Sequence, residues 1–468
     1  MLFSSMTFLF VFMPLVLTAY ILSKKEIRNY ILLAASIIFY AWGEPRYLAI
    51  MIITIITNYA GALLLDRCEN PLKRKLVLLA TLAVDLGFLV YFKYFNFIID
   101  NINWYWATDF EFIDVIMPIG ISFYTFQAIS YLLDVYRKEE KAQKDIYKLA
   151  LYIVLFPQLV AGPIVKYHDV CEQIDDRSVE FKYVIIGFKR FIMGLAKKVL
   201  IANTLAAVVD KIFAQSPDQL SWGMSWLGAT AYAFQLYNDF SGYSDMAIGL
   251  GLMFGFKFLE NFNYPYISKS VTEFWRRWHI SLSTWFKQYL YIPLGGNRIS
   301  PVRTYVNLFL VFLITGIWHG ASWSFVVWGV WNGIFIVLER FFGWNKDSND
   351  KFSLAFARHV YALLAILLGL IIFRSDTLGY SWDYIKVMLK IKSNSGIPEF
   401  DYGLNYKFAI AFVSALILSM PLFKNILYVK YEHKVLRTVI NIWLFILFFL
   451  STTALASSTY NPFIYFRF

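Results

Sequence analysis

Long apolar runs, separated by short polar or charged segments, follow one another along the whole chain. An α-helix needs about 20 apolar residues to cross a bilayer, and several of the runs are shorter than that. The pattern predicts an all-α polytopic membrane protein with about eleven transmembrane helices, in which the shorter runs form re-entrant or amphipathic helices. The apolar runs stand at residues 3–23, 29–43, 47–65, 76–98, 115–135, 146–164, 184–213, 223–237, 241–258, 303–318, 322–342, 357–374, 406–423 and 436–457.

The charges between the first runs indicate which side of the membrane each loop faces. Residues 23–28, 66–75 and 136–145 are rich in lysine and arginine, whereas residues 100–114 contain four acids and no base. Because basic residues collect in cytoplasmic loops, we expect the three basic segments in the cytoplasm and the N-terminus outside. The first run lacks the basic start and the cleavage site of a signal peptide, which predicts a retained span. With no internal repeat, residues 1–468 are expected to form a single membrane domain.

The composition agrees with a membrane protein. Of the 468 residues, 59% are hydrophobic and 16% are charged, and the mean hydropathy is +0.54. The net charge of +11 has two explanations, which are basic cytoplasmic loops and an anionic ligand. Cys68 and Cys171 stand far apart and suggest neither a disulfide nor a thiolate metal site. Because GxGxxG, P-loop, HExxH and GxSxG motifs are missing, we expect no bound cofactor, no metal and no nucleic-acid partner.

One segment, SVTEFWRRWHISLSTWFKQYLYIPLGGNR at 270–298, is too polar for a simple span. At about 100° per residue, Trp275 and Trp278 fall on one side of a helix and the basic residues fall largely opposite. The bases are Arg276, Arg277 and Lys287. This pattern predicts an amphipathic helix that lies at the membrane surface with its bases toward phosphates, followed by a turn at PLGGNR.

Two histidines stand beside tryptophan in apolar surroundings, His279 in RWHIS and His319 in IWHGA. A buried imidazole is costly unless it is hydrogen-bonded or reached by water, and ionisable groups inside membranes often have a function. Together the two can supply a general base, which takes the proton from an attacking hydroxyl, and a group that orients it. Each also has a structural explanation, as a packed or interhelical hydrogen-bonded side chain. Gly320 follows His319 and permits close backbone approach.

Two further stretches are polar within apolar surroundings. In FQLYNDFSGYSDMAIGLG, Asn238, Asp239 and Asp245 can line a polar cavity, cap a broken helix or neutralise nearby arginines. In LFPQLVAGPIVKYHD, two prolines and a glycine predict a discontinuous helix that lines a cavity. The remaining histidines lie in polar or basic flanks, and we expect no role in chemistry for them: His168, His359 and His433.

Two of these stretches resemble the double-histidine signature of the membrane-bound O-acyltransferases: EFWRRWHISLSTWFKQYLYIPLGGNR and TGIWHGASWSFVVWG. The resemblance is to the alginate O-acetyltransferase branch, which acetylates bacterial extracellular polysaccharides. It covers most of the chain, because further stretches are similar to that branch and stand in the same order: MLFSSMTFLFVFMPLVL, FYAWGEPRYL, YNDFSGYSDMAIGLG, FRSDTLGYSWDYIK and NPFIYFRF.

The resemblance implies helices around a central funnel or tunnel and acyl transfer from a cytoplasmic thioester to a hydroxyl outside. In this family the residue placed as His319 is catalytic, and the position of His279 holds His or Asn. The implied donor is acetyl-CoA, and the implied acceptor is an extracellular or cell-wall polysaccharide, reached with a separate SGNH-type partner protein. The implied location is a bacterial plasma membrane, with the chain crossing the lipid bilayer several times.

The candidates for substrate contact surround the two histidines. Trp318 and Trp323 can wall a polar passage or simply pack, and the three bases can attract donor phosphates or, equally, membrane phospholipid. The full set of substrate candidates is Trp275, Trp278, Trp318, Asn238, Asp239, Arg276, Arg277 and Lys287.

Two other functions stay open at this stage. A sibling branch of the same superfamily transfers D-alanine to teichoic acid from a carrier-protein thioester, so the donor distinguishes the two branches. A membrane transporter also suits broken helices with intramembrane His and Asp residues. The paired WH motifs favour acyl transfer.

Overall fold

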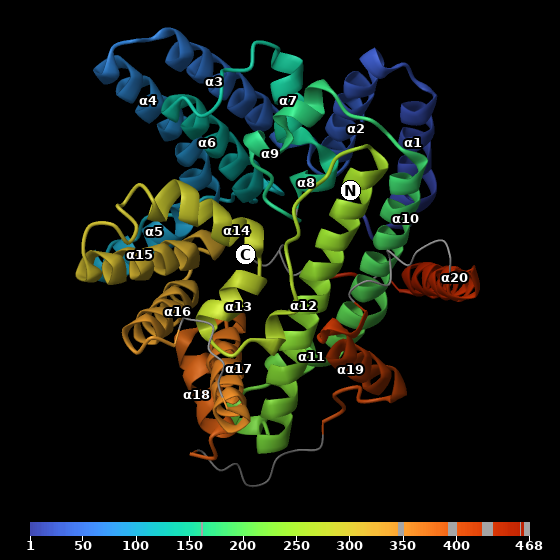
Figure 1. Ribbon diagram of the computed structural model, residues 1–468. Coiled ribbons are helices and arrows are strands. Elements are labelled where there is room, and N and C mark those ends of the chain that lie inside the picture. The colour runs from blue at the N-terminus through green and yellow to red at the C-terminus, as the bar shows by residue number, and fades with distance from the viewer. Residues whose placement is uncertain (161, 345–350, 392–399, 424–433, 459, 463–468) are drawn as a thin grey trace. The chain divides into compact units, whose positions relative to one another are not determined.

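The computed structural model describes residues 1–160, 162–344, 351–391, 400–423, 434–458 and 460–462, and the regular structure of these residues is helical, with no strand (Figure 1). This confirms the all-α class. Contacts between residues group the chain into two compact units, Met1–Phe191 with Ser244–Leu259 and Ile192–Tyr243 with Glu260–Phe468. The boundary between the units passes through two helices, α10 (Phe181–Ala196) and α12 (Trp222–Met253).

The first unit holds the N-terminal helices. In it α3, α4 and α6 pack against one another, and Figure 1 shows them side by side. Most residues of α6 are buried, including Gln127 and Asp134. The helices of this unit, apart from the parts of α10 and α12, are α1 (Met13–Leu22), α2 (Arg28–Gly43), α3 (Leu48–Arg67), α4 (Pro71–Leu89), α5 (Phe95–Trp106), α6 (Ile121–Arg137), α7 (Ile146–Val154), α8 (Phe156–Leu159) and α9 (Tyr167–Asp175).

The predicted discontinuity of the run 146–164 is confirmed. α7 ends at Val154, and the short α8 begins at Phe156 with Pro157 in its first turn. Proline lacks the backbone N–H that would continue the preceding helix, and it is tolerated at a helix start. The helix therefore breaks between α7 and α8, and further along the chain Lys166 precedes α9 in extended conformation.

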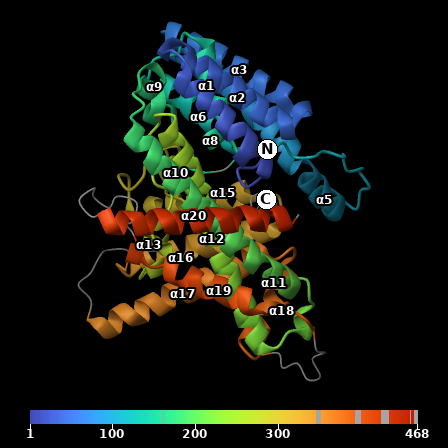
Figure 2. The same cartoon turned by 90° about the vertical axis from the view of Figure 1, so that its right-hand side faces the viewer.

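The second unit contains both histidine motifs. α15, α16 and α17 pack in sequence, α16 against both of its neighbours. Figure 2 shows α20 lying across the helical turn 197–202, against which it packs. The helices of this unit, apart from the parts of α10 and α12, are α11 (Asn203–Phe213), α13 (Val271–Arg277), α14 (Ile280–Phe286), α15 (Pro301–His319), α16 (Trp323–Phe341), α17 (Phe352–Arg374), α18 (Leu378–Met388), α19 (Tyr406–Leu418) and α20 (Lys434–Ser457).

The prediction of two separate spans at 223–237 and 241–258 is wrong, because α12 runs unbroken from Trp222 to Met253. The glycine in its polar stretch serves helix packing instead of a break. A Cβ at Gly242 would lie 2.8 Å from the Gly194 carbonyl oxygen and 3.1 Å from the Lys197 Cβ. A side chain at this position would therefore push apart two segments that are far apart in the sequence.

Seven helical segments within the described residues are long and apolar enough to cross a membrane: Pro45–Arg67, Pro71–Trp106, Phe181–Phe213, Pro301–His319, Trp323–Phe341, Phe352–Arg374 and Lys434–Ser457. The shorter apolar helices Phe8–Leu22 and Tyr406–Leu418 add to them. A multi-pass membrane protein is consistent with these segments. The number of eleven crossings, the central funnel or tunnel and the single domain stay predictions.

Candidate active site

His279 lies at a break between two short helices. The sequence predicts one amphipathic helix from residue 270 to the turn PLGGNR, and that prediction is wrong, because α13 ends at Arg277 and α14 begins at Ile280. His279 adopts φ 43°, in the left-handed region. The segment 261–263 compensates for the lost helical hydrogen bonds: the Asn263 N–H donates to the Arg277 carbonyl (2.9 Å), and the Ile280 N–H donates to the Asn261 carbonyl (3.0 Å). Hydrogen bonds to a remote segment therefore stabilise the break.

The side chain of Asn261 fixes the tautomer of His279. The backbone N–H of Ser281 points to one side-chain atom of Asn261 (3.2 Å), and the Ser281 hydroxyl donates to the same atom (2.9 Å). An N–H needs an acceptor, so this atom is the carbonyl oxygen Oδ1 and not the amide nitrogen. His279 Nδ1 lies 3.2 Å from that oxygen and must donate to it. The lone pair of the imidazole is then on Nε2.

The imidazole of His279 is neutral at ordinary pH. Its exposed fraction is 1%, and this burial lowers the pKa of His279 to about 3. A neutral ring with its proton held on Nδ1 can accept a hydrogen bond at Nε2. His279 therefore offers an acceptor at a fixed position rather than a positive charge.

His319 is the last residue of α15, and aromatic rings surround it. Its ring centroid lies 4.9 Å from that of Trp318, 5.1 Å from that of Trp328 and 5.2 Å from that of Phe373. The ring of Phe325 occupies the space where a Cβ of Gly320 would stand. The space beside this glycine is therefore filled by an aromatic side chain from α16, and the expected close backbone approach stays a prediction.

The structure brings the two histidines together around one small cavity, which we call the histidine chamber. It holds about 30 Å³. Trp318 contacts both imidazoles, since its ring centroid is 6.5 Å from that of His279. The chamber is lined by Leu236, Phe240, Phe274, Trp275, Trp278, His279, His319, Trp328, Asn332, Ile366, Leu370 and Phe373.

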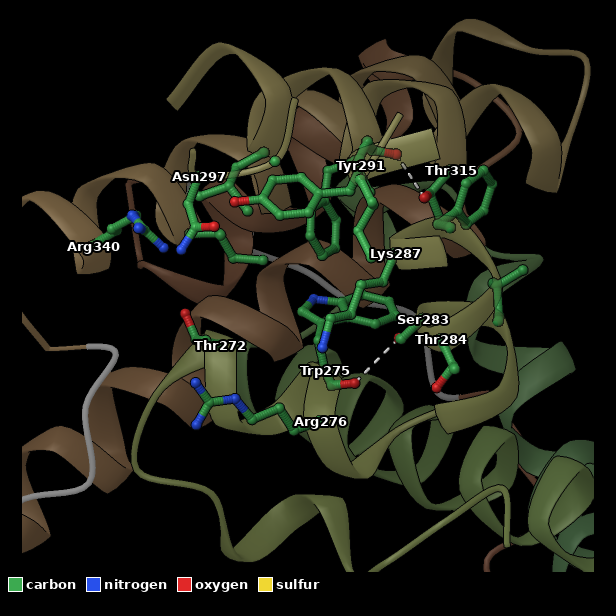
Figure 3. Close-up of a pocket in the computed structure, with 18 of the residues that line it drawn as sticks. Thr272, Trp275, Arg276, Ser283, Thr284, Lys287, Tyr291, Asn297, Thr315 and Arg340 are labelled. Atoms are coloured by element: carbon green, nitrogen blue, oxygen red, sulfur yellow. Dashed lines mark hydrogen bonds between the residues drawn. The ribbon is translucent and has the colours of Figure 1, made fainter. Parts of the chain in front are cut away.

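A second, larger cavity of about 690 Å³, which we call the basic cavity, lies against α13, α14 and α15. Figure 3 shows Arg340 and Asn297 on one side of it and Ser283 and Thr284 on the other. Its cationic lining residues are Arg276, Lys287, Arg298 and Arg340, and none of the lining residues that the structure describes is acidic. The cavity therefore combines apolar walls with a positive charge at several points.

Trp275 lines both cavities. Its indole N–H donates to the side-chain oxygen of Asn332 on α16 (3.1 Å), and the Asn332 amide donates in turn to the Trp328 carbonyl (2.9 Å). These bonds hold the indole at the boundary between the basic cavity and the histidine chamber.

Glu339 holds the N-terminus of α13 in place. This carboxylate is 1% exposed and accepts hydrogen bonds from the backbone N–H groups of Val271 (2.5 Å) and Thr272 (2.8 Å). The first N–H groups of a helix lack partners within the helix and carry a partial positive charge, so a carboxylate stabilises them. Because α13 contributes to both cavities, Glu339 supports both from the neighbouring α16.

Several predicted substrate residues lie outside the lining of the two cavities. Arg277 forms an ion pair with Glu273 (2.9 Å) and donates to the Asn263 carbonyl. Asp239 forms a buried ion pair with Lys198 (2.5 Å), and the neighbouring Asn238 donates to the Phe234 carbonyl. These contacts give Arg277 and Asp239 structural partners, and their roles toward a substrate stay predictions.

In the first unit, Asp245 pairs with Arg190, 2.9 Å apart. Of the roles that the sequence left open for Asp245, this contact is the neutralisation of a nearby arginine. Cation and acid are both largely buried, so each lowers the cost of burying the other.

Sequence reasoning missed five residues of the site or its support: Asn261, Asn332, Arg298, Glu339 and Arg340. Arg298 and Arg340 are bases at the ends of predicted elements and resemble ordinary loop charges. Glu339 had a usable signal, because it is an acid at the end of an apolar run. Among the residues that the structure describes, no three His, Cys, Asp or Glu side chains gather as a metal site requires.

A comparison with known families identifies the class of protein. The sequence model of the membrane-bound O-acyltransferase family (MBOAT) matches residues 137–381, a range that includes both histidines and all helices that line the two cavities. The chain belongs to this family and is an O-acyltransferase.

Curated relatives are similar over most of their length. A probable alginate O-acetylase AlgI of Azotobacter vinelandii is 45% identical, with 82% of this chain and 77% of the relative covered. A peptidoglycan O-acetyltransferase of Helicobacter pylori is 35% identical, with 84% of this chain and 81% of the relative covered. A teichoic acid D-alanyltransferase of Bacillus subtilis is 29% identical, with 50% of this chain and 62% of the relative covered. The resemblance seen in the motifs is thereby confirmed.

Proposed function

We propose that this O-acyltransferase moves an acetyl group from a cytoplasmic thioester, acetyl-CoA, toward hydroxyls of an extracellular or cell-wall polysaccharide in a bacterial plasma membrane. The observation that supports the proposal is the shared chamber: His279 and His319, far apart in sequence, line one small cavity. Trp275 lines both this chamber and a larger cavity with cationic walls. The arrangement matches what acyl transfer needs, a proton acceptor beside a place for a phosphate-bearing donor.

In the proposed reaction His319 is the general base. Its imidazole takes the proton of the acceptor hydroxyl while the hydroxyl oxygen attacks the thioester carbonyl carbon. The new C–O bond forms, the C–S bond breaks, and the thiolate of CoA takes the proton from the imidazolium. His279, neutral and with its lone pair on Nε2, accepts a hydrogen bond in the same chamber and helps orient the reacting groups.

The basic cavity is the proposed place of the donor. Arg276, Lys287, Arg298 and Arg340 can bind the phosphates of CoA, since arginine and lysine form charge-assisted hydrogen bonds with phosphate oxygens. The acetyl end then has to pass Trp275 to meet the histidines. Phospholipid headgroups offer the same phosphate chemistry, and a competition experiment with CoA separates the two.

The relatives support acetyl over D-alanyl as the transferred group. The identity to an alginate O-acetylase is 45% over most of the chain, against 29% over half of it for a teichoic acid D-alanyltransferase. An extracytoplasmic SGNH-type partner that receives the acetyl group belongs to the same proposal. The transporter alternative predicts flux of a solute without consumption of a thioester.

The test uses the purified full chain in sealed vesicles, with labelled acetyl-CoA on the cytoplasmic face and alginate or peptidoglycan fragments on the other. We expect wild type to release CoA thiol and His319→Ala to release none above background. His359→Ala is the matched control, because His359 bonds the Ser268 carbonyl (2.9 Å) and lines neither cavity. Equal thiol release by wild type and His319→Ala contradicts the proposed role of His319.

A further inference from the structure

The helix α17 closes one side of the histidine chamber with a row of three apolar side chains. Ile366, Leu370 and Phe373 are spaced four and three residues apart, so they lie on the same face of the helix. All three line the chamber and are 6–7% exposed. Phe373 also packs edge-on against the imidazole of His319, at an interplanar angle of 83°. This face of α17 therefore sits beside the proposed reacting centre.

The chamber is small. One water molecule needs roughly 10–15 Å³ of cavity on this scale. The volume of about 30 Å³ equals the room for about two waters. An acetyl group has two heavy atoms beyond its carbonyl carbon, an oxygen and a methyl carbon. A propionyl group adds one methylene and a butyryl group adds two, and the rigid rings of Trp278 and Trp328 leave little freedom on the other walls.

We infer that the Ile366, Leu370 and Phe373 face of α17 sets the size of the acyl group, so that the enzyme accepts acetyl thioesters and rejects longer linear acyl thioesters. This inference rests on the proposed function, since it assumes that an acyl thioester reaches the histidines. Leu370 is the main determinant, because it stands in the middle of the row. Phe373 both limits the space and supports His319.

The experiment compares acetyl-, propionyl- and butyryl-CoA in the sealed-vesicle assay, with CoA thiol release as the measurement. Wild type is expected to favour acetyl over propionyl by at least roughly tenfold, the usual effect of one methylene in a tight apolar pocket. Leu370→Ala opens the chamber and is expected to raise the propionyl-to-acetyl ratio by roughly tenfold. Leu364→Ala is the matched control on the same helix, because Leu364 is 40% exposed and does not line the chamber.

Acetyl turnover by Leu370→Ala shows that the variant is folded. If it has lost that turnover, Leu370→Val removes less volume and takes its place, with a smaller rise in the same ratio expected. Equal use of acetyl-CoA and butyryl-CoA by wild type overturns the size limit alone, as does an unchanged ratio in an active Leu370 variant. Consumption of none of the three thioesters by wild type overturns the proposed function, and the size limit with it.

Discussion

The two cavities of the second unit differ in almost every property that matters for binding and chemistry. The basic cavity has about 690 Å³ and four cationic side chains, whereas the histidine chamber has about 30 Å³, two imidazoles and otherwise largely apolar walls. The first suits a large anionic ligand, and the second suits a small uncharged group. From this difference we expect the basic cavity to determine the apparent KM for the donor and the histidine chamber to determine kcat.

The largest expected effect is on kcat in the histidine chamber. His319→Ala removes the proposed general base, which contributes roughly 100- to 10,000-fold to a rate, and leaves the basic cavity unchanged. We expect kcat for acetyl-CoA to fall by that factor while the affinity for CoA, measured by calorimetry, stays the same. A lost affinity for CoA would show that the two cavities are not independent.

The next effect concerns Asn261, which orients His279. Asn261→Leu removes the acceptor for Nδ1–H, and the loss of one buried hydrogen bond is expected to lower kcat by roughly tenfold. The variant Asn261→Asp tests whether Asn261 acts on the protonation of His279, because a purely structural role of Asn261 would not change the pH dependence of kcat. A carboxylate beside Nδ1 favours the imidazolium and raises the pKa of His279 above its value of about 3.

As the pH falls through that raised pKa, the Asn261→Asp variant loses the Nε2 lone pair, so kcat declines on the acid side. Wild type keeps His279 neutral from about pH 5 to 8 and shows no such decline from this residue. The measurement is kcat against pH for the two proteins. Superimposable profiles would argue against any role of the His279 lone pair.

An effect of similar size, but on KM and not on kcat, is expected in the basic cavity. Arg276→Ala combined with Arg340→Ala removes one exposed and one half-buried charge, each worth up to about 1 kcal/mol. We expect the KM for acetyl-CoA to rise by roughly tenfold with kcat unchanged. The effect shrinks with added salt. Arg277→Ala is the control, since Arg277 pairs with Glu273 outside the cavity lining. An equal rise in KM in the control would place the donor phosphates elsewhere.

The last effect is expected on stability and not on kinetics, through the support that both cavities share. Glu339→Gln weakens two hydrogen bonds to the N-terminus of α13 and costs about 1–3 kcal/mol, seen as a lower midpoint of thermal unfolding in detergent. Glu273→Gln is the control, because this acid lies in a half-buried ion pair with Arg277 that contributes about 0–1 kcal/mol. Midpoints equally lowered in both variants would show no special role for Glu339.

The sequence predicts the helices around the site well and the details of the site poorly. The runs 303–318 and 322–342 anticipate α15 and α16 within two residues, because apolar periodicity and flanking polar residues are local properties. The identity of the two histidines is equally visible from their unusual surroundings. Their joint action was proposed from these surroundings, and the structure adds that both line one chamber.

The break at His279 was not predictable, because its cause is remote. No glycine or proline marks it, and the bonds that stabilise it come from residues 261–263. In the same way, Arg340 enters the basic cavity from the end of α16, although the sequence pattern groups it with ordinary loop charges. Contacts between distant segments decide these features, and such contacts cannot be predicted from the periodicity along the chain.

The left-handed backbone at His279 has a consequence for which residues can occupy this position. Apart from glycine, the residues that adopt positive φ most readily are Asn, Asp and His, whereas β-branched side chains clash there. A position that needs this turn and a hydrogen-bonding side chain therefore admits a very short list of amino acids, and the resemblance to the wider family gives two of them, His and Asn. Exchange between these two would alter the chemistry while leaving the course of the chain intact.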